Sequence, residues 1–454
     1  MKDRFFAKTS MIVLLSALCM VMSTQGYADS GKRLYIANDV GFNTPAKRLF
    51  LTENPNVEIK TSIEGYISVN DVISAMVTRN PDIDIYSFSA AGILGEVIQK
   101  DYAYGLSSSE IIDKEQRLYE KTIRDMLQSN GTPYAVVEEY VPRLWAVNVP
   151  LWERLGLGEY PESIAQWMEC LLRARTLQDG TYNVFRNDYS AQTLLYELIT
   201  LYIAQNETED CKLSFSTPVF SEFMQALLSL MEGRSSRESL FSYNVGAEPL
   251  VYLDALPFGE TLPEGVLCFL PPSLRQDGRR YFGADLHVLI VNPFGRQKDL
   301  AIAYLECIVR TRSNYEKALL ERTLNEAIEY EGWNSLKQQY LADREACILE
   351  MPSLEGQELE KIEGRLRFVE EALRDEDGRW CATTDQVQRW REFAPFVRIQ
   401  SRSSYEGQGG AERNFIIGLC AQCLDGQMGI DDLIRKLDER AEMVWMEGGI
   451  SDIR

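Results

Sequence analysis

Short strand-like segments and amphipathic stretches alternate between residues 34 and 100. The predicted strands are the apolar run at 34–37 and the segments 57–61 and 83–86, in which apolar and polar residues alternate. The stretches with helical periodicity that follow them are 45–53, 69–79 and 93–100. Proline ends the first two of these, after Asn54 and Asn80, because it restricts the preceding residue and cannot continue a helix. The alternation predicts an α/β fold on a parallel sheet with right-handed crossovers.

The carboxyl ends of parallel strands are where such sheets bind other molecules. Here these ends are the segments Asn38-Asp39, Glu64-Gly65-Tyr66 and Ser87-Phe88-Ser89. All three are polar or aromatic, and none is glycine-rich like a dinucleotide-binding loop. We therefore expect Asn38, Asp39, Glu64, Tyr66, Phe88 and Ser89 to contribute to one site.

A charged segment at 313–377 has a different pattern. Its apolar residues step by three and four positions, which is the spacing of a coiled-coil seam: Leu359, Ile362, Leu366, Val369 and Leu373. Trp333, Leu336 and Tyr340 begin a similar seam, and Met351-Pro352-Ser353 separates the two. The segment is predicted to be an antiparallel helical hairpin, which either packs on itself or serves as a docking arm for a partner protein.

The composition narrows the possible functions. The chain has 454 residues, is 45% hydrophobic and carries a formal net charge of −21. This charge repels nucleic acid and disfavours it as a partner. His287 is the single histidine, which removes most Ser-His-Asp, Cys-His and multi-histidine zinc schemes. We expect no metal and no cofactor.

The first residues have the form of a targeting segment. Basic Lys2, Arg4 and Lys8 precede an apolar stretch, and Gly26-Tyr27-Ala28 resembles a cleavage site. Residues 1–28 are therefore predicted to be a signal peptide, and the protein to be exported. Cys19 could carry a lipid anchor, but Leu18 is larger than the residue that lipid modification favours.

Eight cysteines follow that segment, scattered along the chain rather than framed as a disulfide scaffold. Cys420 and Cys423 have redox or metal-binding spacing, but they are also neighbours on one helical turn.

Several motifs occur in the order found in one family. They are Asn54 to Ile59, Asp82 to Tyr86, Tyr134 to Asn148, Leu151 to Leu157, Pro161-Glu162-Ser163, Leu213 to Leu230, Leu286 to Pro293, Lys298 to Arg310 and Asp425 to Glu447. Over about 32–312 and 378–447 the chain thereby resembles the extracellular solute-binding proteins of ABC importers, in the sugar-type family 1 branch. It departs from them in Ser163, where they have threonine, and in the insertion at 313–377.

The resemblance implies a two-lobed periplasmic-binding-protein-like fold of type II, closing on its ligand by a hinge. By analogy, 29–141 with 284–312 form lobe I, 142–283 with 378–454 form lobe II, and 313–377 are an inserted helical hairpin. The implied partners are a small solute, most simply a mono- or oligosaccharide, and the subunits of an ABC permease. The protein would be a monomer that meets the membrane only through the permease or a lipid anchor.

Neutral sugars are held by aromatic faces and hydrogen-bonding side chains. Further candidates of these types lie at the crossing and in the second lobe: Glu138, Tyr140, Arg186, Asp188, Tyr189, Tyr243, Tyr281 and Phe282. Adjacent Glu138 and Glu139 also allow a cationic ligand such as a polyamine, although neighbours in an extended segment point to opposite faces.

Two other functions stay open at this point. A secreted glycosidase needs two carboxylates that flank one sugar bond. An acidic chain supplies such pairs by chance, so the composition alone does not support this function. A cell-surface interaction protein could use the 313–377 hairpin.

Overall fold

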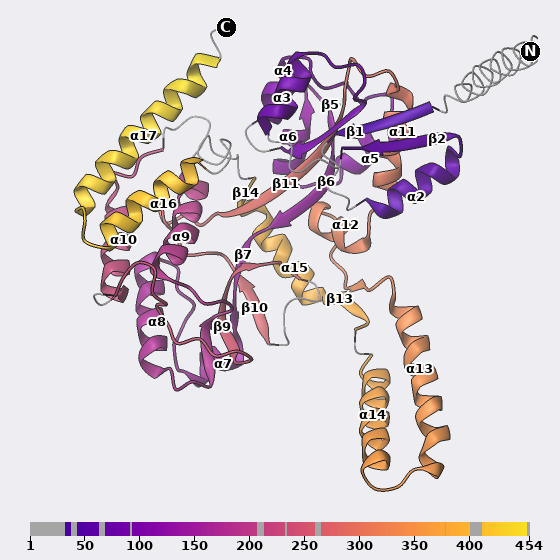
Figure 1. Ribbon diagram of the computed structural model, residues 1–454, viewed down its shortest axis with the longest axis vertical. Coiled ribbons are helices and arrows are strands. Elements are labelled where there is room, and N and C mark those ends of the chain that lie inside the picture. The colour runs from indigo at the N-terminus through magenta and orange to yellow at the C-terminus, as the bar shows by residue number, and fades with distance from the viewer. Residues whose placement is uncertain are drawn as a thin grey trace, which may run out of the picture.

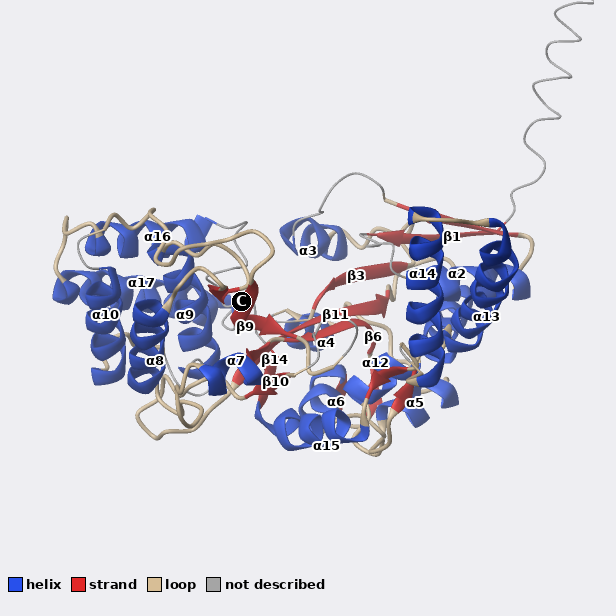
Figure 2. Ribbon diagram, turned by 90° about the horizontal axis from the view of Figure 1, so that it is seen from below, coloured by secondary structure: helices blue, strands red, loops and turns tan. Residues whose placement is uncertain are grey.

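The computed structural model describes residues 32–37, 43–62, 69–90, 93–206, 213–231, 234–258, 265–376, 378–399 and 411–451. Two α/β lobes lie side by side, and an arm of two helices projects from one of them (Figures 1 and 2). This confirms the predicted two-lobed fold with an inserted hairpin. The predicted signal peptide, residues 1–28, lies outside the described part of the chain.

The first lobe is built on a six-stranded sheet of order β14-β11-β3-β1-β2, with β6 also pairing β11. The strands are β1 (Lys32–Ala37), β2 (Val57–Thr61), β3 (Ile85–Ser89), β6 (Ala135–Pro142), β11 (Phe282–Val291) and β14 (Val397–Ile399). The predicted parallel core is present, because β1 pairs parallel with β2 and β3. The sheet as a whole is mixed, since β11 runs antiparallel to β3 and β6.

Helices cover both faces of this sheet. They are α2 (Thr44–Glu53), α3 (Val69–Val77), α4 (Leu94–Gln99), α5 (Glu110–Gln116), α6 (Lys121–Leu127), α11 (Lys298–Arg310), α12 (Asn314–Leu320) and α15 (Thr384–Phe393). A short hairpin of β4 (Gln128–Ser129) and β5 (Thr132–Pro133) leads into β6. The 3-10 turn η2 (Ala394–Phe396) joins α15 to β14.

The second lobe has a four-stranded sheet of order β10-β7-β9-β8. Its strands are β7 (Leu144–Asn148), β8 (Tyr182–Phe185), β9 (Glu248–Ala255) and β10 (Val266–Phe269), and its helices are α7 (Val149–Arg154), α8 (Ile164–Leu177), α9 (Ala191–Asn206), α10 (Pro218–Met231), α16 (Ala411–Leu424) and α17 (Ile430–Ser451). Ser163 and Gln166 form a capping box at the start of α8. Leu419 of α16 and Leu437 of α17 belong to this lobe's core.

The segment after the inserted hairpin differs from the predicted lobe division. Residues 378–454 were assigned to lobe II, yet β14 pairs with β11 in the first sheet. Trp390 of α15 is 1% exposed and packs in the first lobe's core. Helix α12, assigned to the insertion, places Leu319 and Leu320 in the same core. These elements pack on the first lobe because burying each large apolar side chain there stabilises the fold by about 1.5–3 kcal/mol.

The inserted arm consists of α13 (Trp333–Glu350), η1 (Met351–Ser353) and α14 (Gln357–Arg374), with the short pair β12 (Ile328–Glu329) and β13 (Trp380–Ala382) at its base. It projects away from both lobes (Figure 1). Val369 and Cys347 are buried along the seam between the helices. Arg365 and Asp343 form an ion pair of 2.8 Å from one helix to the other. The arm is therefore the antiparallel hairpin that the seam predicts.

A shared apolar core joins the two lobes where the chain crosses between them. Phe282 and Val397 of the first sheet belong to the same buried cluster as Ala146, Tyr252 and Cys268 of the second sheet. The lobes are therefore connected by packed side chains as well as by the crossing strands.

Candidate ligand site at the junction of the lobes

The carboxyl ends of strands in both sheets point toward the junction. In the first sheet, Ser89 at the end of β3 lies opposite His287 in the middle of β11. Pro142 at the end of β6 lies opposite Ala284, near the start of β11, and there the chain leaves for the second lobe. In the second sheet, Ala255 at the end of β9 lies opposite Leu144, where the chain enters. Because β8 runs parallel to β9, the carboxyl ends of both strands point the same way, and Arg186 to Tyr189 follow the end of β8. A molecule held between the lobes would meet these ends.

The predicted first-lobe residues divide into two groups. Asn38, Asp39, Glu64 and Tyr66 lie outside the described residues. Phe88 is 1% exposed and belongs to the core, and Ser89 is buried beside it at the end of β3. The phenyl ring of Phe88 therefore packs inside the protein rather than at the junction surface.

Glu138 and Tyr140 on β6 are also interior residues. The Glu138 carboxylate accepts a hydrogen bond of 2.8 Å from Asn43 Nδ2 and another from Ser87 Oγ. It thereby ties the start of α2 to β3. The Tyr140 hydroxyl is buried and has no hydrogen-bond partner among the described residues, and burial raises its pKa well above the usual range. The polyamine alternative loses support, since both oxygens of Glu138 already have protein partners.

The structure brings four predicted residues of the second lobe together. Arg186 to Tyr189 follow β8 directly, and the Ser239 hydroxyl donates to the Asp188 carboxylate at 2.8 Å. The backbone of Leu240 donates to the Tyr189 carbonyl at 2.9 Å. Tyr243 lies beside them, 43% exposed, with its hydroxyl 3.5 Å from the Arg186 carbonyl. This group offers an aromatic ring, a carboxylate and a guanidinium at the surface.

Tyr281 and Phe282 separate at the start of β11. Phe282 is fully buried against Trp390, with ring centroids 6.0 Å apart. Tyr281 is half-buried, and the Arg398 guanidinium lies 4.2 Å from its ring centroid. Burial by itself would raise the pKa of Tyr281, but hydrogen bonds from Arg279 and Arg398 and their positive charges outweigh it and lower the pKa.

Sequence reasoning missed the residues around Tyr281. Arg275 lies with its guanidinium 5.7 Å from the same ring, and Asp277 accepts from Arg275 at 2.9 and 2.8 Å. The run Arg275 to Arg280, with three arginines in an acidic chain, was a visible signal. Arg398 gave none, because its neighbour across the sheet, Gly283, is distant in sequence.

Redox or metal chemistry finds no support in the described part of the chain. Cys420 and Cys423 are buried in the second lobe's core, and burial raises the pKa of both thiols. The CxxC spacing therefore reflects two neighbours on one helical turn. Among the described residues, no group of three or more His, Cys, Asp or Glu side chains could hold a metal ion. Nor is any described helix long and apolar enough for a membrane span.

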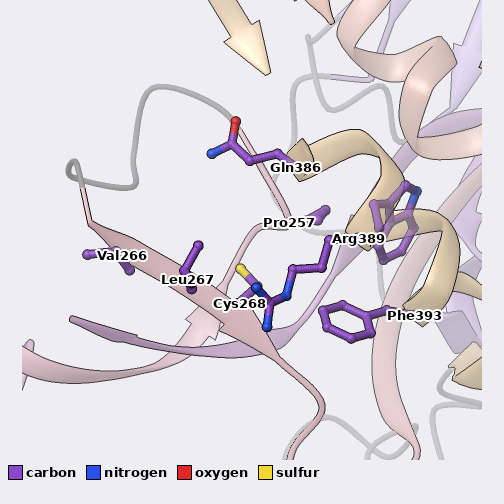
Figure 3. A pocket seen from close by; sticks show the side chains of 8 residues that line it. Pro257, Val266, Leu267, Cys268, Gln386, Arg389 and Phe393 are labelled. Carbon is purple, nitrogen blue, oxygen red and sulfur yellow. The ribbon is translucent and has the colours of Figure 1, made fainter. Parts of the chain in front are cut away.

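A small pocket lies between α15 and β10 (Figure 3). Arg389 and Phe393 from the helix face Leu267 and Cys268 of the strand. About 10 Å³ is open to the centres of water-sized molecules, which is room for about one water. This pocket is too small to hold a sugar.

The same fold occurs in solved structures of binding proteins. A putative binding protein MsmE from Bacillus subtilis in an open conformation superposes with a TM-score of 0.56 at 12% identity, covering 93% of this chain and 100% of that one. The sugar-binding protein MalE from Xanthomonas citri gives 0.54 at 13% identity, with the same coverage. A D-mannitol-bound ABC transporter solute-binding protein from Agrobacterium vitis gives 0.52 at 14% identity, covering 92% and 99%.

These likenesses define the class of fold. The chain has the two-lobed architecture of ABC-type solute-binding proteins, as the motif order predicts, over nearly the whole length of the solved chains. No family model matches the chain. No curated protein matches it in sequence either.

Proposed function

We propose that this protein is the exported solute-binding component of an ABC importer, which captures a carbohydrate between its lobes and delivers it to a membrane permease. The observation that carries the proposal is the junction itself. Strand ends of two separate α/β lobes point at one another, and the chain connects the lobes by adjacent crossing strands. Such an arrangement can bend at the crossing and enclose a solute.

The exposed groups at the junction suit a sugar. The Tyr243 ring can stack on the apolar face of a pyranose, and Asp188 and Arg186 can bind its hydroxyls. Binding would need no covalent step, and the protein would act as a monomer and not as an enzyme. The similar structures include a maltose-bound MalE3 from T. maritima, the D-mannitol-bound protein and the sugar-binding MalE, which supports a carbohydrate here as well.

Calorimetric and thermal-shift titrations against mono- and oligosaccharides, amino acids and polyamines test this function. A ligand at a hundred times its dissociation constant should stabilise the protein by about 2.7 kcal/mol. The ligand should be recovered unchanged. A consumed ligand would point to an enzyme, and a panel without any binding sugar would refute the proposal.

Matched tyrosine variants locate the site. Tyr243→Ala should weaken sugar binding about fivefold to tenfold, because it removes a stacking surface worth about 1–1.5 kcal/mol. Tyr104→Ala is the control, since Tyr104 is similarly exposed, at 39%, but lies after α4 in the first lobe. Equal effects of the two variants would remove Tyr243 from the site.

A further inference from the structure

Three arginines surround Tyr281 at the junction of the lobes. The Arg398 and Arg275 guanidinium groups lie 4.2 and 5.7 Å from the ring centroid, and Arg279 is close enough to help lower the pKa of Tyr281. The Asp277 carboxylate forms an ion pair with Arg275 at 2.8 Å and lies 3.8 Å from Arg279. The cluster gathers three guanidinium groups around one ring in a protein whose net charge is −21.

Strand geometry places the cluster on an open face. Val397 and Phe282 point into the core against Trp390, and neighbouring residues of a strand point to opposite faces. Arg398 and Tyr281 therefore project from the face away from α15. The Arg279 side chain is 70% exposed and Tyr281 is half-buried, so an incoming group can reach both.

Both lobes contribute to the cluster. Arg398 belongs to β14 of the first sheet. Gln205, near the end of α9 in the second lobe, donates to the Tyr281 carbonyl at 2.9 Å and accepts from Arg275 at 2.7 Å through its own carbonyl. A solute enclosed between the lobes would therefore lie close to these guanidinium groups.

We propose that the arginine cluster around Tyr281 binds an oxyanion group of the transported solute, so that this solute is an acidic saccharide bearing a carboxylate, sulfate or phosphate. The guanidinium is planar and suits bidentate bonds to such groups. The overall negative charge does not prevent this, because charges beyond about 8 Å are screened at physiological ionic strength. The inference rests on the proposed function and names the substrate class of that site.

The test compares acidic and neutral ligands on the full exported chain. A galacturonate trisaccharide and a sulfated disaccharide are titrated beside a neutral galactose trisaccharide, each at low and at high salt. We expect the acidic ligands to bind at least tenfold more tightly, with the difference shrinking at high salt. Inorganic phosphate and sulfate alone serve as further probes.

Two variants and a control assign the effect to the cluster. Arg398→Gln and Arg279→Gln should each weaken acidic-saccharide binding about tenfold more than they weaken the binding of neutral saccharides. Arg296→Gln, at an exposed arginine paired with Asp82, should change neither. Melting curves without ligand establish that each variant is folded, and the largely exposed Arg279 keeps the test usable if Arg398→Gln unfolds.

The outcomes separate this inference from the proposed function. Binding of neutral saccharides alone would leave the function standing and overturn the inference. Acidic-saccharide binding that Arg398→Gln and Arg279→Gln leave intact would also overturn it, as would tight binding of inorganic anions without any saccharide. Failure of every saccharide would refute the proposed function itself.

Discussion

A buried ion pair in the first lobe shows how two opposite charges are accommodated in an apolar interior. Arg312 and Glu115 are 2% and 8% exposed in their side chains and form a contact of 2.7 Å between Nε and Oε1. Arg312 also donates to the Val137 carbonyl at 2.8 Å. This pair joins α5, β6 and the start of α12. Removing one partner would leave the other buried and unpaired, which is costly.

Arg312→Met should therefore lower the free energy of unfolding by about 3–5 kcal/mol. The control is Arg117→Met on the neighbouring turn, whose exposed pair with Asp113 should be worth less than about 1 kcal/mol. Urea unfolding of both variants measures the difference. Equal losses would show that the buried pair has no special role.

Tyr281 should lose its proton at a lower pH than the buried tyrosines do. Its pKa is lowered by the arginines around it, whereas burial raises the pKa of Tyr86 and Tyr202 to about 12. As pH rises, tyrosinate absorbance of the wild type minus that of Tyr281→Phe should show one titration below the usual value near 10. Arg398→Gln should move this titration to higher pH. A difference curve centred above pH 10 would contradict the arrangement.

Individual elements follow the sequence closely where their signals are local. The predicted strand at 57–61 and helix at 45–53 match β2 and α2 within one residue, because turn residues and proline mark their ends. The hairpin at α13 and α14 was also predictable, since its seam lies within one segment. Strand β14 and helix α15 were assigned to the wrong lobe, because their partners, Phe282 and Leu319, are far away in sequence.

The hairpin should be dispensable for folding. Its ends meet at the β12–β13 pair, where Glu329 lies opposite Trp380. Replacing 330–379 by a short glycine-serine linker should leave the melting temperature of the lobes nearly unchanged. Trp390→Ala should in contrast cost about 3–5 kcal/mol, because it opens a cavity in the core. Calorimetry on both proteins is the measurement, and collapse of the hairpin-free protein would show that the arm supports the lobes.

The packing of the whole molecule decides which candidate residues reach the surface, and the sequence alone does not reveal that packing. Asp188, Tyr189 and Tyr243 were predicted from residue type, and the structure brings them together through hydrogen bonds between separate loops. Phe88, Glu138, Tyr140 and Phe282 had equally suitable chemistry but lie inside. Their burial depends on α15 and on the helices that cover the first sheet, and no local pattern indicates which strand face those helices occupy.

At this scale we expect ligand binding to compact the protein. Closure of two lobes about the crossing strands should reduce the radius of gyration measured by solution X-ray scattering. Arg117→Met should close like the wild type, because its ion pair lies at the surface of α5. A saturating ligand that leaves the scattering curve unchanged would show that binding occurs without hinge motion.

One buried apolar cluster contains residues of both sheets. We therefore expect the two lobes to unfold together in one cooperative transition. Proteins with several domains often unfold in separate steps. Here Phe282 and Val397 share their packing with Tyr252 and Cys268, so neither lobe can lose its structure without exposing the other's side chains. The chain should give one calorimetric peak, and expression of either half alone should yield an aggregating fragment rather than a functional piece.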